Sequence, residues 1–253
     1  MLSIKQLSFA YDKNNVLEEI SFDIDSGDFC AIIGPNGSGK STLLKAIAGI
    51  LPTKVAGSVY LQDTAIEKFS ARELAKIVSY VPQKQDVVFD FSVFDTILMG
   101  RNPYQNRWEG GNAQDREIVM DVMSKTHLTN LKDRMLGQLS GGEMQRVMIA
   151  RAMAQQTPLM LLDEPLSNLD IAHKYEVMDI LQHLNRQSHT TILIILHDFS
   201  FVKQYTSKSI LIQNGKLQMF SSTDEVLTSN NIRSAFDLSS DYQIDGMGNI
   251  YRN

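Results

Sequence analysis

The stretch Gly34-Pro35-Asn36-Gly37-Ser38-Gly39-Lys40-Ser41, followed by Thr42, decides the fold of this chain. It stands between an apolar run at 29–33, typical of a buried strand, and a segment at 42–49, typical of a helix. Glycines let backbone N–H groups converge on an anion, and a helix that begins at Lys40 directs its positive dipole end at the same anion. This pattern between strand and helix predicts a phosphate-binding loop rather than a chance glycine-rich turn.

Two side chains of this loop have predicted roles in binding a nucleotide. Lys40 is placed to reach the β- and γ-phosphates, and the hydroxyl of Ser41 to ligate Mg²⁺. The loop therefore predicts a nucleotide as ligand and Mg²⁺ as its companion.

The composition limits the class of protein. A chain of 253 residues forms one large domain or a core with a subdomain, and 24 Lys+Arg against 29 Asp+Glu indicate no nucleic-acid partner. The single cysteine, Cys30, cannot make an internal disulfide, and the N-terminus has no secretory pattern, so we expect a cytosolic chain. The longest apolar runs, such as 192–196, are far too short to cross a bilayer.

The hydrophobic pattern predicts an α/β fold. Alternation over 2–25 and at 58–61 indicates an N-terminal antiparallel sheet. Apolar strands at 77–81, 159–163 and 191–196 alternate with helices and indicate a parallel sheet covered on both faces.

The segment from about 91 to 157 has a different pattern. Helices expected at 93–100 and 117–126 flank a polar loop, and helical packing resumes after Gly142. We predict an inserted helical subdomain at about 91–157, on a nucleotide-binding core made of 1–90 and 158–253. A hairpin with its turn at Asn214-Gly215 and a helix from Ser222 are expected near the C-terminus.

Polar side chains follow three of the predicted strands. Asp163 ends a buried strand, where it can hold Mg²⁺ through the metal's water shell, and Glu164 next to it is the candidate general base. Gln83 follows a strand and is a candidate to ligand the metal and orient water. His197 follows another and is a candidate γ-phosphate contact. No metal-ligand spacing links the other histidines, and we expect them to be ordinary residues: His127, His173, His183 and His189.

A second anion site is predicted in the stretch Leu139–Arg146. Its residues Ser140, Gly141 and Gly142 expose backbone N–H groups at the start of a helix. One chain would then carry two phosphate-binding elements.

At this point the chain resembles the ATPase subunit of an ABC transporter over nearly its whole length. The resemblance rests on six spaced motifs: Gly34–Ser41, Gln83, Leu139–Arg146, Asp163-Glu164-Pro165, Ser167-Asn168-Leu169-Asp170 and His197. It implies a single ABC ATPase domain over 1–253, with a P-loop NTPase core that hydrolyses ATP with Mg²⁺. Leu166 and Glu143 depart from the threonine and glutamine common in this family, and we expect neither to touch the chemistry.

The resemblance also implies a head-to-tail homodimer. In this family the serine–glycine–glycine motif of one subunit, here Ser140, Gly141 and Gly142, closes on the γ-phosphate held by the other subunit's loop. Asp170 would help the two sites communicate. Tyr11 would stack on adenine, although an ordinary core or edge tyrosine is the open alternative.

The implied partners are two integral-membrane permease subunits and, indirectly, a substrate-binding protein, at the cytoplasmic face of the cell inner membrane. The segment Leu98–Tyr104 and the context of His197 are similar to importers of iron–siderophore complexes, haem and cobalamin. We favour iron–siderophore import, and haem, cobalamin or a soluble non-transport ABC ATPase stay open. The stretch Arg101-Asn102-Pro103, with Tyr104 and Trp108, is expected to face the permease.

Overall fold

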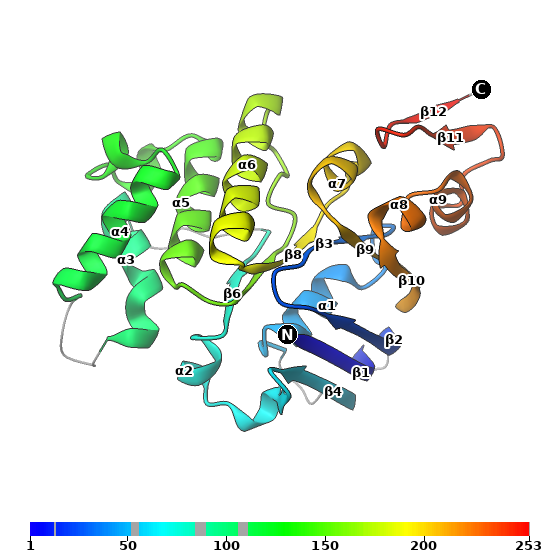
Figure 1. Cartoon of the computed structure of the whole chain (residues 1–253), viewed down its shortest axis with the longest axis horizontal. Helices are drawn as coiled ribbons and strands as arrows, with labels where there is room; N and C mark the ends of the chain where they lie inside the picture. The colour runs from blue at the N-terminus through cyan, green and yellow to red at the C-terminus, as the bar shows by residue number, and fades with distance from the viewer. Residues whose placement is uncertain (13, 52–55, 84–89, 106–110, 253) are drawn as a thin grey trace.

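The computed structural model describes residues 1–12, 14–51, 56–83, 90–105 and 111–252 (Figure 1). Within these ranges its centre is a six-stranded sheet of order β10-β9-β3-β8-β7-β6. The sheet consists of β10 (Lys216–Ser222), β9 (Lys208–Gln213), β3 (Phe29–Ile33), β8 (Thr191–Ile195), β7 (Leu159–Leu162) and β6 (Val78–Val81). All neighbours pair in parallel except β10, which forms the predicted hairpin with β9.

The predicted N-terminal antiparallel sheet is confirmed. Its order is β2-β1-β4-β5, made of β1 (Leu2–Tyr11), β2 (Asn14–Ile24), β4 (Ala56–Leu61) and β5 (Thr64–Ala65). Helix α1 (Lys40–Ile47) lies between this sheet and the parallel sheet (Figure 1) and shares one hydrophobic core with both. The phosphate loop is therefore fixed at the junction of two sheets.

Strand β3 has a core on each of its faces. Phe29, Ala31 and Ile33 pack into the core that contains the helices α5 (Gly141–Ala154), α6 (Ile171–Ser188) and α7 (Phe199–Tyr205). Cys30 and Ile32 pack toward α1. A strand buried on both faces must be apolar throughout, which explains the unbroken run before the loop. Burial raises the pKa of the Cys30 thiol, so this cysteine is a packing residue.

Helices cover the other face of the parallel sheet. They are α3 (Val93–Leu98), α4 (Ala113–Lys125), α5 (Gly141–Ala154), α6 (Ile171–Ser188) and α7 (Phe199–Tyr205). Figure 1 shows α3, α4 and α5 together, on the side away from the C-terminal hairpin. The division into a nucleotide-binding core and an inserted helical subdomain at about 91–157 stays a prediction. Helix α4 begins four residues before the expected 117, because Asn112 and Asp115 form a capping box.

Arg101 corrects one expectation about the permease-facing surface. Its side chain is only 7% exposed, and it pairs with Asp115 at 2.9 Å and donates to the carbonyl of Ala154 at 2.8 Å. A buried guanidinium needs such partners, so Arg101 belongs to the interior between α4 and α5. Tyr104 remains exposed, with the Arg101 guanidinium 4.1 Å from its ring centre, and Trp108 lies outside the described residues.

The remaining elements are short. They are α2 (Ala71–Leu74), α8 (Thr223–Val226), α9 (Ser229–Phe236), the hairpin β11 (Tyr242–Ile244) and β12 (Ile250–Arg252), and the 3₁₀ turns η1 (Ile66–Lys68), η2 (Met99–Tyr104), η3 (Thr129–Leu131) and η4 (Leu136–Gln138). Among the described residues, every helix is too short or too polar to span a lipid bilayer.

Candidate nucleotide site

Four of the six predicted motifs meet at one edge of the parallel sheet. Strands β3, β8, β7 and β6 are consecutive neighbours and run in parallel, so their carboxyl ends lie side by side. The residues that follow these ends are the phosphate loop, His197, Asp163-Glu164 and Gln83. Such an edge is where open α/β sheets bind ligands.

The loop has a backbone shape that its glycines make possible. Gly34 has φ 150° and Gly39 has φ 100°, both in the region that side chains rarely adopt. A Cβ at Gly34 would lie 2.0 Å from the carbonyl oxygen of Ile212, and one at Gly39 would lie 2.7 Å from that of Val16. The loop is therefore held tightly between β9 and β2, and its tip at Asn36 and Gly37 is exposed.

Lys40 lies over the loop with its ammonium directed inward. Its Nζ donates to the carbonyl oxygens of Gly34 and Pro35, both at 2.8 Å. Burial lowers the pKa of Lys40, and the carboxylates of Glu164 and Asp163 oppose this shift. The positive charge is thus concentrated at the loop, next to two acidic groups.

Ser38 provides a direct test of whether the loop fits a phosphate. Its side chain is buried, and its Oγ has no hydrogen-bond partner within the described part of the chain. A buried hydroxyl without a partner is uncommon and requires an explanation. A phosphate oxygen in the loop would accept a hydrogen bond from the Ser38 hydroxyl. The residues therefore fit the nucleotide that the motif predicts.

Asp163 is bound by two hydroxyl groups. Ser41 Oγ donates to Asp163 Oδ1 at 2.9 Å, and Tyr80 Oη donates to Asp163 Oδ2 at 3.2 Å. Burial raises the pKa of Asp163, and the two hydrogen bonds work against this rise. A hydroxyl and a carboxylate held together are the protein oxygens expected beside a nucleotide-bound Mg²⁺.

Glu164 is held by the other two predicted catalytic residues. Gln83 Nε2 donates to Glu164 Oε2 at 2.5 Å, and His197 Nε2 lies 2.8 Å from Glu164 Oε1. A carboxylate only accepts, so a hydrogen bond across this distance would require the proton on Nε2 of His197. Glu164 has φ 49°, a conformation a non-glycine residue rarely adopts, so its backbone is constrained at this point. Three separate strand ends therefore bring their side chains together around one carboxylate.

The stretch around Ser140 forms the start of α5. Ser140 is the N-cap: its Oγ accepts from the Glu143 backbone N–H at 3.3 Å, and its own N–H donates to Glu143 Oε2 at 2.8 Å. Ser140 and Gly141 are exposed, and no described atom outside the adjoining backbone of its own helix and its chain neighbours lies within 4 Å of a Cβ built on Gly141. The helix start therefore remains open to a ligand or partner.

Glu143 contacts the predicted anion site directly. Its carboxylate accepts from the Ser140 hydroxyl at 2.8 Å as well as from the Ser140 backbone. These bonds lower the pKa of Glu143 and keep it ionised. Glu143, which stands where glutamine is common in this family, therefore contacts the serine that is expected to meet the γ-phosphate.

Tyr11 and Asp170 lie at the ends of their elements. Tyr11 is the last residue of β1, is 40% exposed and packs edge-on against Phe9 at 4.8 Å between ring centres. Asp170 is the N-cap of α6, and its Oδ2 lies 2.8 Å from Nδ1 of His173. Hydrogen bonds from the backbone and side chain of His173 lower the pKa of Asp170.

Two residues with specific contacts were not singled out from the sequence as parts of a site. Tyr80 is the third residue of β6, and its hydroxyl close to the strand end before Gln83 is a usable signal. His173, expected to be ordinary, stands three positions after the N-cap Asp170, a spacing at which capping contacts form. Neither signal is specific without the fold.

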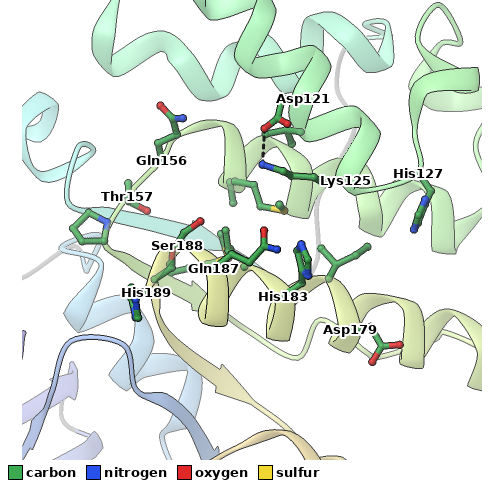
Figure 2. Close-up of a pocket in the computed structure, with 18 of the residues that line it drawn as sticks. Asp121, Lys125, His127, Gln156, Thr157, Asp179, His183, Gln187, Ser188 and His189 are labelled. Atoms are coloured by element: carbon green, nitrogen blue, oxygen red, sulfur yellow. Dashed lines mark hydrogen bonds and ion pairs between the residues drawn. The ribbon is translucent and has the colours of Figure 1, made fainter.

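A cavity of about 780 Å³ lies away from this site, between α4, the end of α5 and α6 (Figure 2). Side chains of α4 and α6 face one another across it, and three of the histidines expected to be ordinary, His127, His183 and His189, line it. Pro158 and Thr190, also in its wall, precede β7 and β8, so the cavity lies at the opposite edge of the sheet from the loop. Among the described residues, no group of three His, Cys, Asp or Glu side chains could hold a metal ion.

The fold and the site define the class of protein. A family model described as "ABC transporter" matches residues 17–167, and the chain belongs to this family. The chain is an ATPase of this family, with a phosphate loop that fits ATP.

Individual relatives are similar over nearly the whole chain. The iron(3+)-hydroxamate import ATP-binding protein FhuC of Bacillus subtilis (strain 168) is 34% identical over 96% of this chain and 90% of its own length. The ferric enterobactin transport ATP-binding protein FepC of Escherichia coli (strain K12) is 35% identical over 92% of this chain and 86% of its own. A solved metal-chelate type ABC transporter in an inward-facing conformation superposes with a TM-score of 0.82 at 32% identity, over 93% of this chain and 88% of that one.

Proposed function

We propose that this chain is the ATP-hydrolysing subunit of an importer of iron–siderophore complexes, working with Mg²⁺ as a homodimer at the cytoplasmic face of the inner membrane. The observation that carries the proposal is the cluster around Glu164, where Gln83 and His197 bind its two carboxylate oxygens at 2.5 and 2.8 Å. A carboxylate fixed in this way, beside a phosphate loop, has the position of a general base for attack on a γ-phosphate.

The phosphates of ATP would lie in the loop 34–42. Backbone N–H groups of the loop and the Ser38 hydroxyl would donate to phosphate oxygens, and Lys40 would exchange its two carbonyl partners for the β- and γ-phosphates. Ser41, Gln83 and, through water, Asp163 would hold Mg²⁺, which neutralises charge on the phosphates when bound. Tyr11 would stack on adenine, which is supported by its exposure at the end of β1.

Hydrolysis would proceed by in-line attack of water on the γ-phosphoryl group. Glu164 would accept the proton of the attacking water, while Gln83 would orient that water. His197 would donate a hydrogen bond from Nε2, first to Glu164 and then to the γ-phosphate. In this scheme the cluster around Glu164 rearranges when ATP enters.

A second subunit would complete each site. Ser140 and Gly141 are exposed at the amino end of α5, and the positive end of the helix dipole there suits an anion. We infer that this surface closes on the γ-phosphate held by the partner and that Asp170 communicates between the two sites. ATP binding would close the dimer and hydrolysis would reopen it.

The solute is inferred from what the relatives are named for. Those with 32–37% identity include proteins named for the import of iron(3+)-hydroxamate, petrobactin and ferric enterobactin. We infer two permease subunits, a substrate-binding protein as an indirect partner, and no nucleic acid. Haem and cobalamin are the alternative solutes, and a soluble non-transport ABC ATPase is the alternative class.

Transport by the reconstituted importer tests the proposal. Vesicles that contain the chain, its permease pair and its binding protein are supplied with labelled ferric siderophore, haem or cobalamin, with and without internal MgATP. We expect ATP-dependent uptake of the siderophore alone, and no uptake with the Glu164→Gln chain. Uptake of haem or cobalamin instead would change the solute, and ATP hydrolysis that is not coupled to any permease would contradict import.

A further inference from the structure

His173 lies where the amino ends of α5 and α6 meet. Both carboxylate oxygens of Asp170 are directed at it: Oδ1 accepts from the His173 backbone N–H at 3.0 Å, and Oδ2 lies 2.8 Å from Nδ1 of the ring. The first bond fixes the position of the His173 backbone, and the second fixes the orientation of the imidazole ring. The imidazole is thus held in one position although the side chain is 34% exposed.

The same ring packs against the first turn of α5. A Cβ built on Gly142 would lie 2.7 Å from Cδ2 and 2.9 Å from Cγ of His173. The ring therefore fills the space that a side chain at position 142 would take. Because Gly142 does not have a positive φ, this contact, and not backbone conformation, is the structural reason for glycine here.

The two helices are joined again one turn further on. Arg146 of α5 and Glu176 of α6 form an ion pair at 2.5 Å, with the arginine side chain 11% exposed. Two contacts on the same side of a helix pair fix both the distance and the rotation of one helix against the other. Of these two contacts, the one between His173 and Gly142 is closer in sequence to Ser140, the N-cap of α5. It therefore has the greater effect on the position of Ser140.

We propose that His173 is a positioning residue, whose ring holds the amino end of α5 in register with Asp170, so that Ser140 and Gly141 meet the nucleotide on the partner subunit. The proposal rests on the shared site proposed above. It assigns His173 no contact with ATP. Loss of the ring should therefore leave ATP binding to the subunit's own loop unchanged and lower kcat, since a misplacement of about 1 Å costs up to roughly 100-fold.

Mixed dimers separate the two subunits' contributions. In a dimer where one chain carries Glu164→Gln, the turnover that remains comes from the other chain's Glu164, with Ser140 supplied by the Glu164→Gln chain. We expect His173→Ala on the Glu164→Gln chain to lower kcat by about 10- to 100-fold with little change in KM. The same substitution on the other chain should change kcat less than about twofold, because its Ser140 faces the inactive site.

Further variants separate the two contacts of the ring from an effect on folding. His173→Asn keeps a donor near the position of Nδ1 without the ring, and His173→Phe keeps the ring without the donor. His183→Ala, on the same helix but in the wall of the distant cavity, is the matched control. We expect both substitutions of His173 to retain more activity than His173→Ala, and thermal unfolding to show that all four chains are folded.

A double substitution tests the packing contact directly. Gly142→Ala alone forces its Cβ against the ring and should lower kcat, whereas Gly142→Ala with His173→Ala should lose less than the sum of the two single effects. Strictly additive losses, or equal effects of His173→Ala on either chain of the mixed dimer, would overturn the inference. If Ser140→Ala on the Glu164→Gln chain leaves turnover intact, the two subunits do not share a nucleotide site, and the proposed function fails. This result can be told apart from a failure of the role of His173 alone.

Discussion

The Ser41 hydroxyl donates a hydrogen bond to Asp163 Oδ1 across 2.9 Å, although the two residues are 122 positions apart in the chain. The bond joins the first turn of α1 to the end of β7. It brings the hydroxyl of the phosphate loop into contact with the carboxylate at the end of the acidic strand. These two oxygens are the centre of the proposed Mg²⁺ site.

We expect Ser41→Ala to raise the Mg²⁺ concentration needed for half-maximal ATP hydrolysis by roughly 10- to 100-fold. The substitution removes one proposed metal ligand and one partner of Asp163. A Mg²⁺ titration at fixed ATP measures the effect. Ser200→Ala is the matched control, because Ser200 makes an equivalent hydroxyl bond to Asp198 at 2.6 Å. An unchanged Mg²⁺ requirement in Ser41→Ala would remove Ser41 from the metal site.

Tyr80→Phe should shift the acid limb of the pH profile of kcat/KM to higher pH. The Tyr80 hydroxyl lowers the pKa of Asp163, so without it the carboxyl group, whose pKa burial already raises, takes up its proton at a higher pH. Mg²⁺ requires the ionised form, and activity is therefore lost earlier as the pH falls. Tyr60→Phe, the same change on the antiparallel sheet, is the control. A limb that stays in place, or moves to lower pH, would show that Tyr80 does not tune Asp163.

Glu164→Gln should preserve ATP binding and lower turnover by about 10²- to 10⁴-fold, since the amide cannot accept the proton of the attacking water. ATP would then hold the dimer closed. Size-exclusion chromatography with and without ATP measures the dimer, and phosphate release measures turnover. Glu67→Gln, at an exposed position on η1, is the control. Hydrolysis at the normal rate in Glu164→Gln would exclude Glu164 as the base.

Arg101→Ala should lower the free energy of unfolding by about 3–5 kcal/mol, because it leaves the buried carboxylate of Asp115 without its charged partner. The comparison is Lys125→Ala, which breaks the exposed pair with Asp121 and should cost less than about 1 kcal/mol. Urea unfolding of both variants measures the difference. Equal, small losses would mean that the Arg101–Asp115 pair is not needed for the helical subdomain.

The sequence by itself determined the motifs and their order. The loop 34–41 could be predicted because its requirements are local: glycines where the backbone approaches an anion, with a strand before and a helix after. Asp163, Glu164, Gln83 and His197 could be predicted because each follows an apolar strand, and parallel strands bring their carboxyl ends to one edge. Both arguments depend on neighbours along the chain and on a single rule of topology.

Only the tertiary structure decided which side chains meet. Tyr80 reaches Asp163 across 83 positions, Arg101 is buried through Asp115 and Ala154, and the ring of His173 fills the space beside Gly142. None of these contacts follows from residue type, because a tyrosine, an arginine or a histidine is compatible with both a core and a surface. The packing of distant elements selects one partner among many, and that selection is a property of the whole fold.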